Sequence, residues 1–303
     1  MKIIVTGASG LIGSRLVPFL QSKGHSITRF VRDKARAERD DGARVVEWNP
    51  QRGELNAAEL EGHDAVVHLA GEPVAEGRWT DEKKRRIRDS RVQGTSLLAA
   101  KLTECANPPH TFISASAVGF YGDRGDETLR EESAAGGGFL AGVCREWEAA
   151  ADAAREKGIR VVCARMGVVL SPDGGALAKL VTPFKLGVGG KLGSGEQYMS
   201  WIAIDDAVEA LHHALTNAQL AGAMNVVAPN PVTNSEFTES LGRILGRPTL
   251  FTVPKFAARL AFGEMADATV LTSQRALPTR LLATNFVFKY PELEGALRYL
   301  LRS

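Results

Sequence analysis

Short apolar runs rich in β-branched residues alternate along the chain with longer stretches in which apolar residues recur at helical spacing. The runs are continuously hydrophobic, which is typical of strands buried on both faces of a parallel sheet. Helical spacing is clearest at Ile12, Leu16, Phe19 and Leu20, and again from Val92 to Leu102. The pattern therefore predicts a doubly wound α/β fold of the Rossmann type. The predicted strands are residues 2–6, 26–31, 43–48, 64–70, 110–116, 159–165 and 223–228.

The alternation changes after about Ser171. The chain is then rich in glycine, with a helical piece around Leu177–Phe184, and beyond Asn230 it is mainly helical with a strand-like stretch at 285–290. We therefore predict a dinucleotide-binding domain and a smaller, mainly helical C-terminal lobe. The domain comprises residues 1–170 and the returning segment 201–228, and the lobe comprises 171–200 and 229–303.

Composition narrows the class of protein. The chain has 303 residues, 44% of them hydrophobic, and a formal net charge of only +2. A nearly neutral chain has no global field that would favour nucleic acid or a membrane surface. The charged run at 81–91 interleaves acids with bases, which is typical of a solvated helix face. We expect neither nucleic acid nor membrane as a partner.

Three features favour a cytoplasmic protein. The three cysteines are widely spaced, and their spacing is typical neither of a metal-binding pair nor of a disulfide framework. The first ten residues resemble no signal peptide, and no apolar run approaches the roughly 20 residues that span a bilayer.

The adjacent His212 and His213 have no acidic or cysteine ligand at metal spacing, so we expect no metal site.

The stretch VTGASGLIGSRL places Gly7, Gly10 and Gly13 between the first strand and the first helix, with Leu11 and Ile12 inside the turn. Glycines at such a turn allow the backbone to approach a pyrophosphate and allow helix and strand to pack closely. The helix N-terminus then offers free N–H groups to the anion. We predict that this turn binds the pyrophosphate of a dinucleotide.

The end of the second strand indicates which dinucleotide. An acidic residue about 20 positions beyond the glycines would bind the ribose 2′-hydroxyl of NAD, whereas an arginine accommodates a 2′-phosphate. Val31 stands where the carboxylate is expected, Arg32 follows it, and Asp33 lies one or two positions late. The sequence thus predicts NADP(H) in preference to NAD.

Motifs spread over the whole chain resemble those of the extended short-chain dehydrogenase/reductase superfamily, which includes sugar-nucleotide epimerases and dehydratases. They occur in the expected order as TGASGLIG, HLAG, SASAVGFYG, ARMGVVL and SWIAIDDAVEAL. A closer resemblance is to an atypical branch, the "epimerase family" proteins with a distinct C-terminal domain. Its likeness lies in LAGEPVAEGRWT, FLAGVCREWEAA, GSGEQYMSWI and PVTNSEFTESLGRILGRP.

This resemblance implies further cofactor contacts. Leu69, Ala70 and Gly71 would line the adenosine or ribose side beyond the fourth strand, and Arg91 would reach the cofactor from the following helix. Residues from Arg165 to Val169 would lie beside the nicotinamide half. The predicted cofactor residues in that range are Arg165, Gly167, Val168 and Val169, and the remaining ones are Glu72 and Ser114.

Enzymes of the same superfamily use a tyrosine as the proton carrier. A lysine one helical turn later lowers the pKa of this tyrosine, and a serine on the preceding strand orients the substrate oxygen. The pair matters because a phenol, with a pKa of about 10, is a poor base without a cationic neighbour. If Trp147 aligns with the end of that motif, the tyrosine position falls near Leu140 and the lysine position near Cys144. The serine is retained as Ser116. The cofactor site is predicted to be complete, but the usual catalytic pair is absent.

Two interpretations stay open. The protein is an NADP-dependent oxidoreductase or epimerase with a relocated proton carrier, for which Tyr121, Glu72, Glu131, Glu132 and Cys144 are candidates. Alternatively, it binds NADP(H) without turnover as a redox-responsive or nucleotide-responsive module. The predicted catalytic residues are Ser116 and Tyr121.

The substrate is expected beyond the carboxyl ends of the strands, between the two parts of the chain. Gln197, Tyr198, Ser200 and Trp201 lie close together in sequence there, although burial is the commoner fate of a tryptophan. No arginine pair marks a nucleotide-diphosphate pocket, so the sequence specifies no particular small-molecule substrate. A homodimer is left open.

Overall fold

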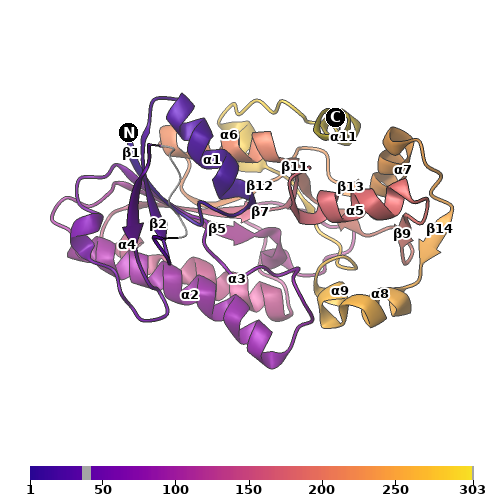
Figure 1. Cartoon of the computed structure of the whole chain (residues 1–303), viewed down its shortest axis with the longest axis horizontal. Coiled ribbons are helices and arrows are strands. Elements are labelled where there is room, and N and C mark those ends of the chain that lie inside the picture. Colours follow the sequence, from indigo (N-terminus) through magenta and orange to yellow (C-terminus); the bar gives the residue numbers. More distant parts are fainter. Residues whose placement is uncertain (36–41, 302–303) are drawn as a thin grey trace.

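A seven-stranded parallel sheet forms the centre of the protein, with helices on both faces (Figure 1). The structure is a computed structural model that describes residues 1–35 and 42–301. The strand order is β3-β2-β1-β4-β5-β7-β12, so the direction of winding reverses between β1 and β4. The strands are β1 Lys2–Thr6, β2 Ser26–Val31, β3 Arg44–Glu47, β4 Ala65–His68, β5 Thr111–Ala117, β7 Arg160–Met166 and β12 Gly222–Val226. All seven predicted strands, and the Rossmann-type fold, are confirmed.

Successive residues of each strand serve opposite faces of the sheet. In β1, Ile3 and Val5 are buried in the core beneath α1 (Leu11–Ser22) and α6 (Ile204–Thr216), whereas Ile4 is buried beneath α2 (Asp81–Glu104). This alternation follows from the two-residue period of a strand. Because both faces are covered, the strands are hydrophobic throughout.

Helix α2 shows how the charged run 81–91 is used. Thr80 caps its N-terminus by accepting a hydrogen bond from the Lys83 amide, and Asp81 and Glu82 lie in the first turn, where the helix dipole favours acids. Outward-facing bases pair with carboxylates, as in Arg88–Glu146 at 2.6 Å. The run is a charged helix surface, as predicted. On the same face of the sheet lie α3 (Phe139–Ala149) and α4 (Asp152–Glu156).

Beyond Met166 the chain builds a second hydrophobic core. Trp201, Phe184 and Leu241 are buried in it, together with residues of the last helix, α11 (Leu293–Leu300). The division of the chain into two units remains a prediction, and this separate core supports it. The helices are α5 Gly175–Lys185, α7 Asn234–Leu245, α8 Lys255–Phe262, α9 Glu264–Ala268 and α10 Thr279–Ala283.

Short paired strands tie this second part together. The pairs are β8 (Val168–Leu170) with β11 (Trp201–Ala203), β9 (Gly190–Leu192) with β14 (Phe251–Val253), β10 (Tyr198–Met199) with β13 (Val232–Thr233), and β6 (Thr128–Leu129) with β15 (Arg275–Ala276). The prediction of a strand-like stretch at 285–290 is wrong, because those residues form no strand. Phe286 instead packs into the core beside α6, which explains the apolar pattern.

Candidate functional site

The glycine turn lies where β1 ends and α1 begins, at the winding reversal. Gly7 has a φ of +68°, and a Cβ there would lie 2.7 Å from the backbone N of Ala70. A Cβ on Gly13 would lie 2.2 Å from the carbonyl oxygen of Gly7. Neither position accepts a side chain, so both glycines are required for β1, β4 and α1 to pack.

Gly10 differs from its two neighbours. It is exposed, has an ordinary φ of −75°, and its added Cβ would meet only the Gly7 carbonyl oxygen, at 3.3 Å. Gly10 is the N-cap residue of α1, and it supplies no side-chain cap. The first turn contains no acidic residue, so the backbone amides at the helix start, including those of Leu11 and Ile12, are not occupied by a cap or an acid of that turn. An anion is the partner that such a helix start favours.

The ends of β1 and β4 are joined by a polar contact that the sequence analysis missed. Thr6 Oγ1 lies 2.6 Å from His68 Nδ1 and accepts a hydrogen bond from the Ala70 amide at 3.3 Å. His68 is fully buried, and burial lowers its pKa to about 3, so the ring is neutral. The contact holds Leu69 and Ala70 against the glycine turn. The sequence feature that could have indicated this contact is His68, which directly precedes Leu69, Ala70 and Gly71.

Val31 and Arg32 lie at the same edge of the sheet, one strand away from the turn. Val31 ends β2 and is partly buried, and Arg32 follows it with an exposed side chain. This is the position from which a guanidinium can reach a 2′-phosphate. The charge of Arg32 also contributes to lowering the pKa of Glu72, after the larger effects of Lys83.

Gly71 and Glu72 continue the chain beyond β4. Glu72 accepts a hydrogen bond from Lys83 Nζ at 2.7 Å, and this bond is the main cause of the lowered pKa of Glu72. A carboxyl held in its ionised form by a cation is a poor proton donor. Arg91 reaches the same place from α2 and donates to the Glu72 carbonyl at 3.0 Å. Gly71, Glu72 and Arg91 therefore lie together, and their contact with a cofactor stays a prediction.

A buried ion pair lies at the ends of β5 and β7. Arg165 donates from Nε and Nη2 to the two carboxylate oxygens of Glu148, at 2.8 and 2.9 Å. Ser116 donates to Glu148 Oε1 at 2.7 Å. Because an ionised carboxylate only accepts, the proton of Ser116 is committed to Glu148, and the Ser116 oxygen keeps only its capacity to accept. The Ser116 side chain is buried and also contacts the Cys144 thiol.

Tyr121 belongs to the same network. It is fully buried at the end of a short 3-10 helix, Val118–Tyr121, and its hydroxyl donates to Asn225 Oδ1 at 2.7 Å while accepting from Arg165 at 3.0 Å. Burial is the largest effect on Tyr121 and raises the pKa of its phenol. The geometry favours a role in positioning Arg165.

The other candidate carboxyls differ in setting. Glu131 is buried and accepts the backbone amides of Asn225 and Arg280 at 3.2 and 3.1 Å, which ties β12 to the start of α10. Glu132 is exposed. Glu131 therefore serves the packing of the second part of the chain.

Helix α3 carries the positions of the missing pair. Leu140 is partly buried, and a Cβ on Gly119 would lie 3.5 Å from it. Cys144 is buried, and burial raises the pKa of its thiol to about 11, so the thiol is protonated at neutral pH. Glu148 lies one turn after Cys144 on the same helix face. This spacing was the available signal for Glu148, which sequence reasoning did not single out.

The remaining predicted cofactor residues are partly accounted for by packing. Ser114 is buried within β5, paired with His68 on one side and Cys163 on the other. A Cβ on Gly167 would lie 2.5 Å from the Ser200 carbonyl oxygen. Val168 and Val169 pair with β11 and are partly buried. Gly167 is therefore needed for the approach of β11, whatever it contributes to a ligand.

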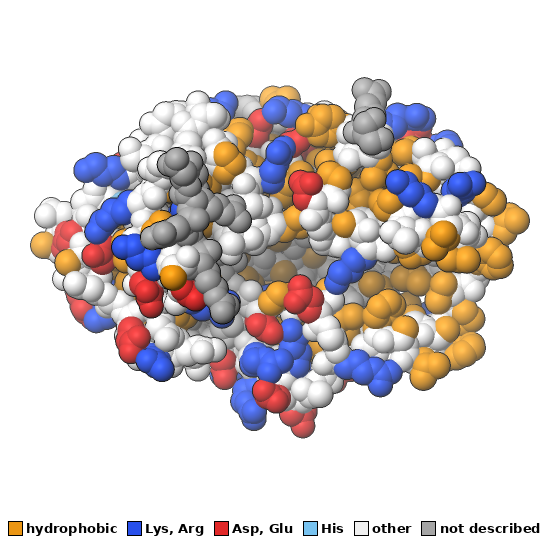
Figure 2. Space-filling view, in the orientation of Figure 1, with side chains coloured by type: hydrophobic (Ala, Val, Ile, Leu, Met, Phe, Trp, Pro, Cys, Tyr) orange, Lys and Arg blue, Asp and Glu red, His pale blue; other side chains and the backbone are white. Residues whose placement is uncertain are grey.

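Of the residues proposed for the substrate side, several have structural partners. Trp201 is fully buried and donates to the Asn230 carbonyl, and Ser200 donates to the Gln274 carbonyl. Tyr198 packs beneath the guanidinium of Arg275. Figure 2 shows the face hollowed near its middle, with hydrophobic side chains gathered over α7, α8 and β14. Exposed apolar residues of β14 and α8, and of the position just before β14, are Leu250, Phe251, Phe256, Leu260 and Phe262.

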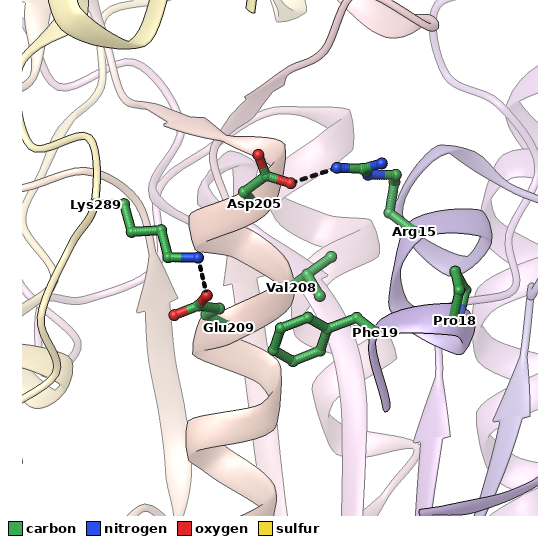
Figure 3. A pocket seen from close by; sticks show the side chains of 7 residues that line it. All are labelled: Arg15, Pro18, Phe19, Asp205, Val208, Glu209 and Lys289. Carbon is green, nitrogen blue, oxygen red and sulfur yellow. Dashed lines mark hydrogen bonds and ion pairs between the residues drawn. The ribbon is translucent and has the colours of Figure 1, made fainter. Parts of the chain in front are cut away.

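A surface pocket of about 240 Å³ lies between α1 and α6 (Figure 3). Arg15 pairs with Asp205 at 2.7 Å, and Lys289 pairs with Glu209. The charges of these two ion pairs cancel, and Pro18, Phe19 and Val208 supply the rest of the wall. No unpaired reactive group distinguishes this pocket among the described residues.

Within residues 1–35 and 42–301, no group of three or more His, Cys, Asp or Glu side chains could hold a metal ion. Over the same residues, no helix combines the length and the apolar character that crossing a membrane requires.

Comparison with known families gives two matches. The profile of the "NAD dependent epimerase/dehydratase family" matches residues 3–227. A "domain of unknown function (DUF1731)" matches residues 253–300, within the predicted C-terminal lobe.

Similar proteins cover nearly the whole chain. An epimerase family protein of Mycobacterium bovis is 43% identical over 297 residues, which are 98% of this chain and 96% of that protein. The human epimerase family protein SDR39U1 is 35% identical over 98% of this chain and 99% of its own length.

Solved structures agree. A crystal structure of human SDR39U1 with NADPH superimposes with a TM-score of 0.89 at 32% identity and covers 99% of both chains. A nucleoside-diphosphate sugar epimerase from Corynebacterium glutamicum gives a TM-score of 0.81 at 40% identity, covering 99% of this chain and 58% of its own.

Proposed function

The chain belongs to the NAD dependent epimerase/dehydratase family, and we propose that it binds NADP(H) and acts as an oxidoreductase or epimerase on a small carbonyl, hydroxyl or sugar-like compound. The observation that carries the cofactor proposal is the open start of α1 at Gly10, beside two glycines that packing requires. The NADPH in the similar human structure supports the same cofactor.

The residues present fit this cofactor. The amides at the start of α1 would hold the pyrophosphate, and Arg32 would hold the 2′-phosphate. Leu69, Ala70 and Gly71 would line the crevice between them, with Glu72 and Arg91 beyond. On the side of β5 and β7 the proposed contacts are Ser114, Arg165, Gly167, Val168 and Val169.

When bound, NADP(H) supplies a hydride, and the protein must place the substrate and manage its proton. Ser116 is directed by Glu148 to accept a hydrogen bond, so it would hold a substrate hydroxyl. Arg165 fixes Glu148, and Tyr121 in turn fixes Arg165. In this proposal Ser116 contacts the substrate and Tyr121 acts through its neighbours.

A second function, NADP(H) binding without turnover, is favoured by one observation. The polar groups of the Ser116–Glu148–Arg165–Tyr121 network satisfy one another, and no proton carrier stands at Leu140 or Cys144. A broad panel of carbonyl compounds separates the two functions. Consumption of bound NADPH with any of them supports the enzyme, and inertness with all of them supports the binding module.

The cofactor proposal is tested at Gly10. Gly10→Asp places a carboxylate at the helix start, where its Cβ meets only the Gly7 carbonyl oxygen, at a tight 3.3 Å. We expect NADPH affinity to fall about a hundredfold by charge repulsion. Ser14→Asp adds the same charge to an exposed position one turn later and is the matched control. Isothermal calorimetry measures both. Equal NADPH affinity in the two variants would contradict binding at this turn.

Arg32 tests the choice of dinucleotide. Arg32→Ala should weaken NADPH binding about tenfold and leave NADH binding nearly unchanged, because only NADPH carries the 2′-phosphate. The ratio of the two dissociation constants is the measurement. An unaltered ratio would remove the reason for preferring NADP(H) at this site.

A further inference from the structure

Arg91 and Arg165 are two inward-facing arginines with opposite surroundings. Arg165 is held by both oxygens of Glu148. Among the described residues, Arg91 donates to two backbone carbonyls, those of Glu72 at 3.0 Å and Ile87 at 2.9 Å. Its guanidinium also lies 5.0 Å from the centre of the Trp147 ring. These partners are neutral, so they satisfy hydrogen bonds without cancelling the charge.

The acidic groups near Arg91 are already engaged. Glu72 accepts from Lys83 at 2.7 Å, and Glu148 is bound by Arg165. The neighbouring Cys144 thiol has its pKa raised to about 11 by burial and is uncharged. No carboxylate of the described residues forms an ion pair with Arg91. Burial is the largest effect on Arg91 and lowers its pKa, while the nearby Glu72 carboxylate acts in the opposite direction.

This charge lies at the edge of the sheet that holds the proposed cofactor. A Cβ on Gly71, just beyond β4, would lie 3.3 Å from the Arg91 guanidinium carbon. Trp147 places the same guanidinium against α3, which packs on β5. Arg32 lies on the other side of the winding reversal, at the end of β2. In this fold the two nucleotide halves occupy opposite sides of the reversal. With Arg32 proposed to hold the adenosine half, Arg91, on the helix that follows β4, falls to the half that carries the nicotinamide.

We propose that the unpaired charge of Arg91 makes the site select the reduced cofactor, NADPH, over the oxidised form, NADP⁺. The two forms share every phosphate and differ by the single positive charge of the oxidised nicotinamide ring. A fixed cation on that side raises the free energy of the oxidised form alone. The inference rests on the proposed NADP(H) binding and extends it to a preference of the bound redox state.

The ratio of the dissociation constants of NADP⁺ and NADPH, measured by calorimetry on the same protein, tests the inference. The wild-type protein should bind NADPH about tenfold or more tightly, as expected for one unit charge at several ångströms in a partly solvated site. Arg91→Gln and Arg91→Met should bring the ratio close to one. Arg91→Lys should keep the preference, because the charge remains although the fork of hydrogen bonds is lost.

Two controls isolate the charge. Arg88→Gln removes an exposed arginine of the same helix, which is paired with Glu146, and should leave the ratio unchanged. Arg32→Ala should weaken both forms equally. Because both forms are measured on one protein, a general loss of affinity or of folded material cancels in the ratio.

The outcomes separate this inference from the function on which it rests. A wild-type protein that binds neither form contradicts the proposed function. Equal binding of both forms by the wild type, or an unchanged preference in both neutral variants of Arg91, overturns the inference while NADP(H) binding stands.

Discussion

The two sides of the sheet edge are built by different means. On the side of β1 and β4, backbone and glycines form the surface, and Gly10 and the first turn of α1 remain open. On the side of β5 and β7, side chains from five elements meet in a closed network around Glu148 and Arg165. An open backbone surface suits a ligand shared by a whole family, whereas a side-chain network can be rebuilt for a particular chemistry.

Breaking the network should have the largest effect on stability. Arg165→Met leaves the Glu148 carboxylate, whose side chain is only 14% exposed, without its cation. We expect the free energy of unfolding to fall by about 3–5 kcal/mol, measured by urea denaturation.

The double variant Arg165→Met/Glu148→Leu is the control for that loss. Replacing both partners by apolar groups removes the buried charge and should recover most of the stability. A single variant as stable as the wild type would mean that the ion pair does not hold this side together.

The glycine turn should respond next most strongly. Gly13→Ala forces a methyl group toward the Gly7 carbonyl, where only 2.2 Å is available, and should cost about 2–3 kcal/mol of unfolding free energy. Gly10→Ala, in the same turn, should lower the unfolding free energy by only a few tenths of the Gly13→Ala effect. Thermal denaturation of the two variants measures the difference, and equal stabilities would contradict the different roles assigned to these glycines.

A smaller effect should appear with pH at His68. Its pKa is about 3 in the folded protein and near 6.5 when unfolded, so the unfolded chain binds more protons below pH 6.5. Stability is therefore lost as the pH falls, by about 1.4 kcal/mol between pH 7.5 and 5.5 from this residue.

His68→Asn tests that contribution, because it keeps a polar side chain near Thr6 but does not titrate. Unfolding free energies of the variant and the wild type should converge toward pH 5.5. Parallel pH profiles would show that His68 contributes nothing to the acid sensitivity, which other partly buried histidines such as His63 and His212 also affect.

Much of the architecture could be predicted from local pattern. Seven hydrophobic runs became the seven strands, and the glycine spacing located the turn, because strand burial and tight turns restrict the residues at each position directly. The expected strand at 285–290 failed because its alternation serves packing against α6 rather than pairing with a neighbour.

The sequence by itself determined the fold class, the glycine turn and the absence of the usual tyrosine and lysine. Only the tertiary structure decided which side chains lie near the positions of that missing pair. Glu148, Arg165, Ser116 and Tyr121 are separated by up to 49 positions in the chain, and no local pattern reports which of them share a hydrogen bond. Nor does a sequence show that Arg165 has a carboxylate partner while Arg91 has none within residues 1–35 and 42–301, because charge neutralisation depends on distances that form only when strands and helices pack.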